Sequence, residues 1–173
     1  MACTSYSLAG LNGSCDPSKG GIVEVMVAFY QEDAATVGTA NTVSSFATGI
    51  TWYGYAFKKG TGSMTSTLNV DPANGVNYVS TDLVLQFTKM DTAKRLEMKA
   101  LSLDDLMVIV KDANGTYWFL GKDEPVQASA GTGQTGQNRS DGNFYQITLQ
   151  ANDDDFPIAV DKAAVPVPTY PQA

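Results

Sequence analysis

Hydrophobic residues fall in short runs along the chain, with the lengths and the alternation of β-strands. Residues 22–30 are apolar except for Glu24, which predicts a strand buried in the core. Residues 50–59 alternate aromatic and small side chains, and residues 143–150 alternate polar and apolar ones, as expected of further strands. Residues 156–160 predict a last short strand. The pattern therefore predicts a mainly β fold.

Two segments have the pattern of β-hairpins. Residues 61–82 alternate around a turn at 71–75 (DPANG) and continue into the apolar run 83–87, which predicts a long hairpin with a mostly polar outer half. Such a ribbon buries little by itself, so we expect it to contact a neighbouring molecule or a water-filled space. Residues 106–111 and 117–120 flank Asn114-Gly115, a dipeptide typical of a tight hairpin with a type I′ turn.

One segment has helical periodicity. Asp91 is a suitable N-cap for a helix over about 92–102. Its apolar residues recur at helical spacing and predict one buried face, made of Ala93, Leu96, Ala100 and Leu103. We expect the remaining, basic positions to face outward.

Together these elements predict a single β domain over residues 22–160, β-sandwich or barrel-like, with one α-helix near 92–102. Residues 31–49 have few apolar side chains and predict a long loop without a core contribution. Residues 1–21 predict an extended N-terminal arm. Residues 161–173 contain Pro166, Pro168 and Pro171 and predict an extended C-terminal arm.

Charge and composition exclude several classes of function. The chain has 173 residues with 11 Lys+Arg against 18 Asp+Glu, a net charge of −7. Nucleic-acid binding needs clustered Lys and Arg, whereas Arg95 and Arg139 are the only two arginines. The sequence contains no histidine, which removes the commonest general base, the commonest metal ligand and the Ser-His and Cys-His nucleophile pairs. We therefore expect no enzyme activity and no cofactor.

Two patterns resemble ligand sites but lack the context that such sites need. Residues 131–136 (GTGQTG) match the glycine pattern of dinucleotide sites, but Asn138, Ser140 and Asp141-Gly142 follow where a helix should begin. The run 153–155 (DDD) has no calcium-site spacing, and successive side chains of an extended loop point in different directions. We expect a flexible hairpin loop and a solvated turn at these places, and no metal site.

The termini and cysteines bear on compartment. The first residues lack the basic and apolar regions of a signal peptide, and the longest aliphatic run, 106–110, is too short to span a membrane. We therefore expect a soluble protein made in the cytoplasm, with free thiols at Cys3 and Cys15. The alternative is a disulfide between these two cysteines, which would close a short loop.

A family resemblance covers roughly residues 60–160. It is carried by 83–87 (LVLQF) followed by 94–100 (KRLEMKA), by 106–121 (LMVIVKDANGTYWFLG), and by the Gly-rich loop that leads to 143–149 (NFYQITL). In the order of its parts the chain resembles the tail-tube (major tail) proteins of long-tailed bacteriophages, which are related to the tubes of contractile injection systems.

The resemblance implies a structural virion protein that assembles into hexameric rings, with sheets joined edge to edge around a lumen for DNA passage. Its location would be the virion tail, after synthesis in the host cytoplasm. Its partners would be further copies of itself and other tail proteins, with double-stranded DNA passing without specific binding and no membrane contact. The polar hairpin then supplies candidate subunit contacts, namely Ser66, Thr67, Asn69, Asp71, Asn74 and Tyr78. Candidates for the lumen or ring face are Glu32, Asp33 and Asp82.

Two other classes of function stay open. A β-rich binding module of a virion, such as a receptor- or carbohydrate-binding decoration protein, could stack a sugar on Trp52, Tyr53 and Tyr55, although alternating aromatics are more often core and cross-strand pairs. A glycosidase needs two facing carboxylates and no histidine. The acids of this sequence fall mainly in turns.

Overall fold

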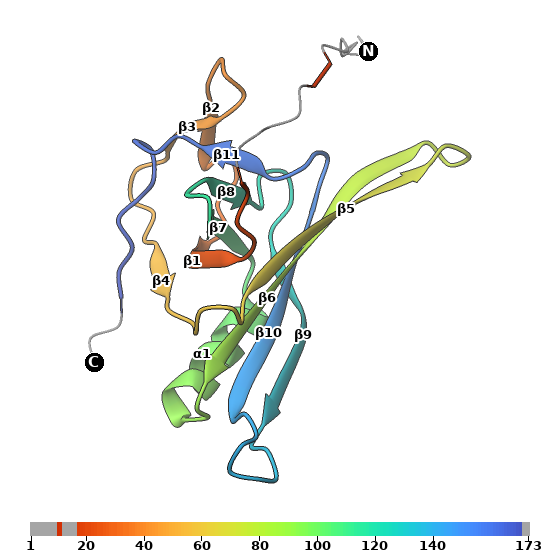
Figure 1. Ribbon diagram of the computed structural model, residues 1–173. Helices are drawn as coiled ribbons and strands as arrows, with labels where there is room; N and C mark the ends of the chain where they lie inside the picture. The colour runs from red at the N-terminus through yellow and green to blue at the C-terminus, as the bar shows by residue number, and fades with distance from the viewer. Residues whose placement is uncertain (1–9, 12–16, 171–173) are drawn as a thin grey trace.

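The computed structural model describes residues 10–11 and 17–170, and it confirms a mainly β fold whose described part contains one helix. Cys3, Cys15 and most of the predicted N-terminal arm lie outside the described residues. The strands form two sheets in which most neighbouring strands are antiparallel (Figure 1). Sheet A has seven strands in the spatial order β2 (Ala35–Val37), β3 (Val43–Phe46), β11 (Ile158–Val160), β8 (Tyr117–Leu120), β7 (Leu106–Asp112), β1 (Ile22–Phe29) and β4 (Tyr53–Tyr55).

Sheet B has four strands, and the helix lies beside it (Figure 1). The strand order is β5 (Ser63–Asp71), β6 (Val76–Thr88), β10 (Phe144–Asp153) and β9 (Gln127–Gln134), with every neighbouring pair antiparallel. The helix α1 (Thr92–Leu103) follows β6 and contacts β9 and β10.

Both faces of sheet A are buried, which explains the continuous apolar runs of its central strands. In β1, Val25 and Val27 join the core cluster shared with sheet B, whereas Met26 and Ala28 join a second cluster on the opposite face. Strand β7 divides its residues between the two clusters in the same way. A strand buried on both faces needs apolar residues at every position, not at alternate ones.

The second cluster corrects the prediction of a core-free loop over residues 31–49. That segment contains β2 and β3, and it contributes the buried Ala34 and Val43. Phe46 packs its ring edge-on against Trp52 and Phe119, with centroids 5.2 Å apart in both pairs. A few apolar residues suffice here because they only cover a sheet face that the other strands already supply. The strand predicted over 50–59 is shorter and covers Tyr53–Tyr55.

Strand β9 was not expected, because residues 127–134 (QASAGTGQ) lack the β-branched and aromatic residues typical of strands. Its ladder with β10 pairs Gln134 with Phe144 and Gln127 with Gln150. The segment therefore forms a strand despite its weak β-propensity, because it makes backbone hydrogen bonds to β10. The glycine-patterned segment 131–136 lies at the end of this strand and in the loop before β10, with no helix after it.

Helix α1 has the predicted N-cap but a different buried face. The Asp91 carboxylate accepts the Lys94 backbone N–H at 2.8 Å. Leu101 is buried and Met98 packs against the core, whereas Leu96 and Leu103, predicted to be buried, are 55% and 72% exposed. Ala93 and Ala100 are exposed too, so all four positions predicted to be buried lie on the surface of the isolated subunit, because the sheet contacts a neighbouring face of the helix.

The β7–β8 hairpin is present, but its turn is not type I′. That turn requires positive φ at both central residues, and only Gly115 has one, at +90°. Asp112 organises the turn instead, because its Oδ1 accepts the backbone N–H groups of Asn114 at 2.8 Å and Thr116 at 2.9 Å. The Asn114 side chain then pairs with the backbone of Lys19, which fixes the chain before β1 to this turn.

The described part of the C-terminal arm crosses the edge of sheet A. Thr169 exchanges backbone hydrogen bonds with Trp52 and Gly54 at 2.7 and 2.9 Å. Tyr170 lies directly over Gly54, where an added Cβ would overlap its ring, and its hydroxyl donates to Glu24 at 2.8 Å. The arm therefore covers part of the open edge of β4. In the part of the chain that the structure describes, no helix is long and apolar enough to cross a membrane.

Candidate functional site

The predicted contact residues of the long hairpin divide between its two faces. Ser66 lies on the core side, where its hydroxyl is 2.8 Å from that of the buried Thr81. Thr67, Asn69, Asp71 and Tyr78 lie on the opposite side, with Asn69 directly across from Tyr78. Asn74, in the turn, donates to the Asp71 carboxylate at 2.6 Å. That hydrogen bond, with those from the Asn74 and Ala73 backbone, holds the pKa of Asp71 below its ordinary value.

The hairpin belongs to the core at its base and projects beyond it at its tip (Figure 1). Val79 and Thr81 are buried, and Met64 packs against the main cluster. Past Val79 the exposed apolar residues begin, and Leu68 and Val70 are 48% and 58% exposed. The expectation of a largely core-free hairpin thus holds for its outer half and is wrong for its base.

The outer face of sheet B is mostly polar and carries no positive charge. Alternate residues of β6 and β10 are buried against the core, so the residues between them point away from it. None of these outward residues belongs to a core cluster; those at the centre of the face are Ser80, Asp82, Val84, Gln86, Gln146, Thr148 and Gln150, of which Val84 alone is apolar. The four strands, all described, contain no lysine or arginine at any position. The charged side chains of this face are Asp71 and Asp82.

Sheet B ends in two open edges. Among the described strands, none pairs with the outer side of β5 or of β9. Strand β9 is exposed along nearly all of its length. Neither strand contains the lysine or proline with which edge strands commonly block further pairing. Both edges therefore offer unpaired backbone groups to another strand.

The predicted lumen residues do not come together. Asp82 lies on the outer face of sheet B, where Gln150 donates to it at 3.0 Å. Glu32 and Asp33 lie in the turn between β1 and β2, where Asp33 lines a small hollow with Lys122 and Asp123. Burial and the nearby carboxylates of Glu32 and Asp123 raise the pKa of the Tyr30 hydroxyl. Glu32 and Asp33 thus lie in a turn that joins two strands of sheet A, and of the three predicted residues Asp82 alone lies on the outer face of sheet B.

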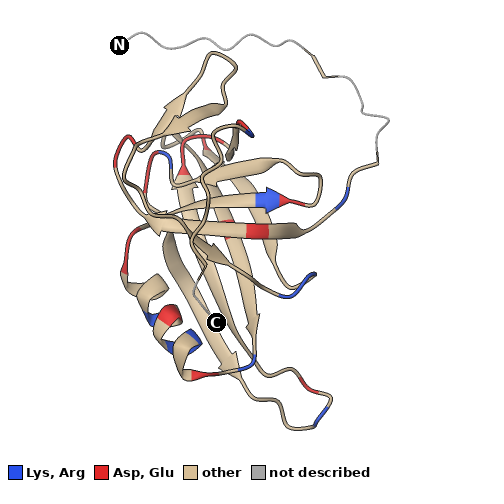
Figure 2. Cartoon of the chain, turned by 90° about the vertical axis from the view of Figure 1, so that its left-hand side faces the viewer, with Lys and Arg blue, Asp and Glu red and all other residues tan. Residues whose placement is uncertain are grey.

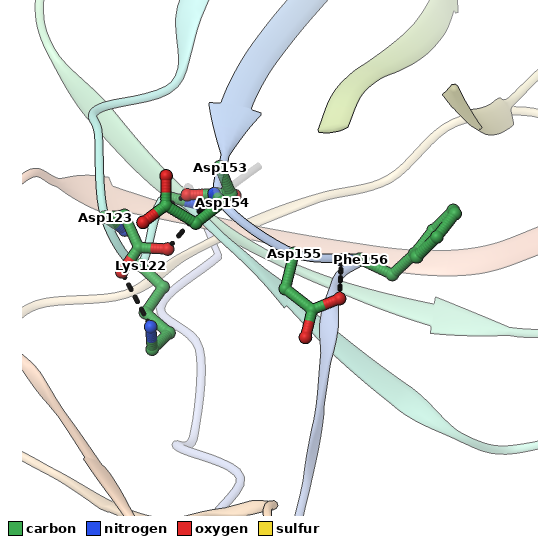
Figure 3. A network of polar contacts seen from close by, with 7 residues as sticks. Lys122, Asp123, Asp153, Asp154, Asp155 and Phe156 are labelled. Carbon is green, nitrogen blue, oxygen red and sulfur yellow. Dashed lines mark hydrogen bonds and ion pairs between the residues drawn. The ribbon is translucent and has the colours of Figure 1, made fainter. Parts of the chain in front are cut away.

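The acidic run at the end of β10 is structural (Figure 3). Asp153, predicted to lie in a solvated turn, is only 8% exposed. Its carboxylate accepts backbone N–H groups from Gly121 at 3.4 Å and Asp123 at 3.0 Å, so it ties the β8–β9 loop to the end of β10. Asp123 pairs with Lys122 at 2.6 Å. Within the described residues, no group of three or more His, Cys, Asp or Glu side chains converges as a metal site would require.

An apolar groove lies between α1 and β4, and the sequence patterns gave no sign of it. We call it the α1–β4 groove; it has a volume of about 490 Å³ and is lined mainly by Tyr53, Tyr55, Phe87, Ala93, Met98 and Leu101. A smaller cavity of about 110 Å³ shares Tyr53, Tyr55 and Leu101 and extends to Phe29. Tyr55 donates its hydroxyl to Glu97 at 2.5 Å. Burial, with this hydrogen bond, raises the pKa of Tyr55 strongly.

The aromatic residues considered for sugar stacking do not form a flat exposed platform. Trp52 is buried in the second core cluster, and Tyr53 is 40% exposed at the edge of the groove. Tyr55 is tied to Glu97 across the groove. The three side chains therefore serve core and groove packing.

Comparisons with known proteins give no relative: no family model, no curated protein and no solved structure matches the chain. The function must therefore be argued from the geometry.

Proposed function

We propose that this chain is a structural, non-enzymatic subunit of a bacteriophage tail tube. Copies join edge to edge through β5 and β9 into hexameric rings, and the rings stack around a lumen through which DNA passes. The observation that carries the proposal is sheet B, which combines two open edges with one polar face that lacks basic residues. The number six and the phage context rest on the family resemblance.

The strand directions of sheet B suit repeated joining. Because the sheet has four antiparallel strands, its two edge strands, β5 and β9, run in opposite directions. A neighbour related by rotation about a ring axis therefore presents its β5 antiparallel to β9, and the alternation continues around the ring. Such closure removes the exposed edges, which in a free monomer favour uncontrolled aggregation.

The outer face of sheet B suits a DNA channel. Its hydroxyl and amide side chains keep the wall wetted, and its charges, Asp71 and Asp82, have the same sign as phosphate. Like charges repel a polyanion over about one Debye length, ~8 Å at physiological salt. A wall without basic residues lets DNA pass without being held.

Proline substitutions in β9 test the edge. In an antiparallel strand, adjacent residues direct their N–H groups to opposite sides. Of Ala130→Pro and Gly131→Pro, one therefore removes a hydrogen bond to β10 and lowers the unfolding midpoint, whereas the other removes an N–H of the open side only. We expect the variant that loses only an N–H of the open side to remain a folded monomer under conditions in which the unaltered chain forms rings. Rings of normal size from that variant would contradict joining through β9.

A further inference from the structure

Two asparagine–glycine pairs lie in hairpin turns of the described chain. Asn74-Gly75 lies at the tip of the long hairpin, and Asn114-Gly115 lies in the β7–β8 turn. A third pair, residues 12–13, lies outside the described residues. Asparagine is thermolabile, most of all before glycine, because the unhindered glycine nitrogen can attack the asparagine side-chain carbonyl within the same molecule. The fold therefore decides which of the two described pairs can react.

Asn114 is held on every group that this reaction would move. Its Oδ1 accepts the Lys19 backbone N–H at 2.8 Å, and its Nδ2 donates to the Lys19 carbonyl at 3.1 Å. The attacking nitrogen is occupied as well, because the Gly115 N–H donates to the Asp112 carbonyl at 3.1 Å. Several hydrogen bonds must therefore break before the side chain of Asn114 can turn toward the nitrogen of Gly115.

Asn74 is exposed and is held by a single side-chain contact. Its Nδ2 donates to the Asp71 carboxylate at 2.6 Å, and Asp71 belongs to the same exposed tip. Within the described part of the chain, the Asn74 Oδ1 accepts no hydrogen bond and the Gly75 N–H donates none to a backbone carbonyl. The carbonyl carbon of Asn74 and the nitrogen of Gly75 can therefore approach each other once one hydrogen bond breaks.

We propose that Asn74 is a site of spontaneous deamidation in the folded protein, and that the fold protects Asn114 from the same reaction. The backbone nitrogen of Gly75 forms a bond to Cγ of Asn74 and gives up its proton. The bond from Cγ to Nδ2 breaks, and that nitrogen takes up the proton and leaves as ammonia. Water then opens the cyclic imide at either of its two carbonyl carbons, which gives aspartate or isoaspartate at position 74 without any oxidant or reductant.

The modification changes the tip of the hairpin. A carboxylate at position 74 replaces the amide that now donates to Asp71, so two like charges stand where a hydrogen bond was. Isoaspartate also lengthens the backbone of the turn by one carbon atom. The chemistry needs only the folded subunit, so it goes beyond the proposed function and does not depend on it. It would add one negative charge with age to a chain of −7.

Peptide mapping of the folded full chain tests the site. The protein is kept in warm, neutral to mildly alkaline buffer and sampled over time. Trypsin places Asn74 in residues 60–89 and Asn114 in residues 112–122, and electron-transfer fragmentation distinguishes aspartate from isoaspartate. Asn74 should convert about tenfold faster than Asn114 or more, because fewer hydrogen bonds must break. Its rate should rise with pH, because the nucleophile is the deprotonated nitrogen. An unchanged Asn74, or an Asn114 that converts as fast, would overturn the proposal.

Two controls separate the chemistry from the fold. Asn77 is exposed in the same hairpin but precedes Tyr78, whose bulk hinders attack, so it should stay unmodified; conversion of Asn77 at the rate of Asn74 would contradict the cyclic imide route. In the chain unfolded by urea, Asn74 and Asn114 should convert at similar rates. A preference for Asn74 that is undiminished in urea would assign the difference to local sequence and overturn the protective role of the fold.

Discussion

Single carboxylates organise the loops at the ends of the sheets. Asp112 receives two backbone N–H groups and, at 3.1 Å, the indole N–H of Trp118. Asp153 holds the β8–β9 loop in the same manner. Both carboxylates accept backbone N–H groups of the chain, so Asp153, from the acidic run first considered as a calcium site, acts here as a structural acceptor.

Asp112 gives a prediction of pH dependence. Partial burial opposes its ionisation, but the N–H groups of Thr116 and Asn114 and the Trp118 indole outweigh it and hold the pKa of Asp112 below its ordinary value. A depressed folded-state pKa contributes stability above the unfolded pKa of about 3.9, and this contribution is lost as the pH falls through the folded value. Asp112→Asn should therefore lower the free energy of unfolding at pH 7, and its difference from the unaltered chain should shrink toward pH 2.

Urea unfolding of both proteins between pH 7 and pH 2 measures this difference. Glu124→Gln, at an exposed carboxylate, is the control and should show little difference at any pH. A deficit of Asp112→Asn that is constant with pH would argue against ionisation of Asp112 as the cause.

At the scale of elements, the long hairpin combines two roles. Its base supplies Val79, Thr81 and Met64 to the core, and its outer half supplies exposed surface. The boundary lies at the Leu68–Val79 pair. In the proposed tube subunit, folding would therefore depend on the base of this element and assembly on its outer half.

A shortened hairpin should fold but fail to stack. Replacing residues 69–78 by Asn-Gly keeps Val79 and the base of the ladder and provides a two-residue turn. We expect a thermal midpoint within about 4 °C of the unaltered chain and no tubes by negative-stain microscopy. The point variant Ala73→Gly, which keeps both strands, should still assemble. Unfolding of the shortened chain would show that the outer half of the hairpin stabilises the subunit, and would contradict its separation from the base.

Elements with strong local signals were predictable from the sequence, and those fixed by neighbouring elements were not. Alternation in residues 143–150 predicted most of β10, which extends to Asp153, and the Asp91 cap predicted α1. Strand β9 has no propensity signal, and it forms because β10 presents an unpaired edge. The helical face of Leu96 and Leu103 was predicted to be buried because periodicity finds an apolar stripe without showing which layer covers it.

For the candidate site too, local signals were predictable from the sequence, and features fixed by neighbouring elements were not. The mostly polar sequence of the hairpin predicted the projecting ribbon. Only the strand register shows that Ser66 faces the core side and Thr67 the outer side. Glu32 and Asp82 were grouped by charge, but the fold places Glu32 in the turn between β1 and β2 of sheet A and Asp82 on β6 of sheet B. The α1–β4 groove brings together segments distant in the chain, so no local pattern marks it.

At the scale of the whole molecule, charge is distributed unevenly. The chain carries −7, yet α1 is locally basic and the strands of sheet B lack basic residues altogether (Figure 2). Two open edges and a mostly polar face without basic residues are the features of the whole molecule on which the proposed assembly rests.

Binding of double-stranded DNA tests this charge distribution. The unaltered assemblies should give no gel shift at low salt. Gln146→Lys with Gln150→Lys places two positive charges per subunit on the outer face of sheet B, and repetition around a ring should create binding that weakens steeply with added salt. Leu96→Lys with Leu103→Lys adds the same charge to exposed positions of α1 and should bind DNA less well. Micromolar binding by the unaltered protein would contradict a non-binding wall.

The central claim, that sheet B closes into rings around a lumen, is tested most directly by electron microscopy of the concentrated, purified chain, with light scattering on the same sample. The account predicts closed rings, alone or stacked, each with a central channel walled by continuous β-strands. A strictly monomeric protein at high concentration over a range of salts, or assemblies without a channel, would contradict it.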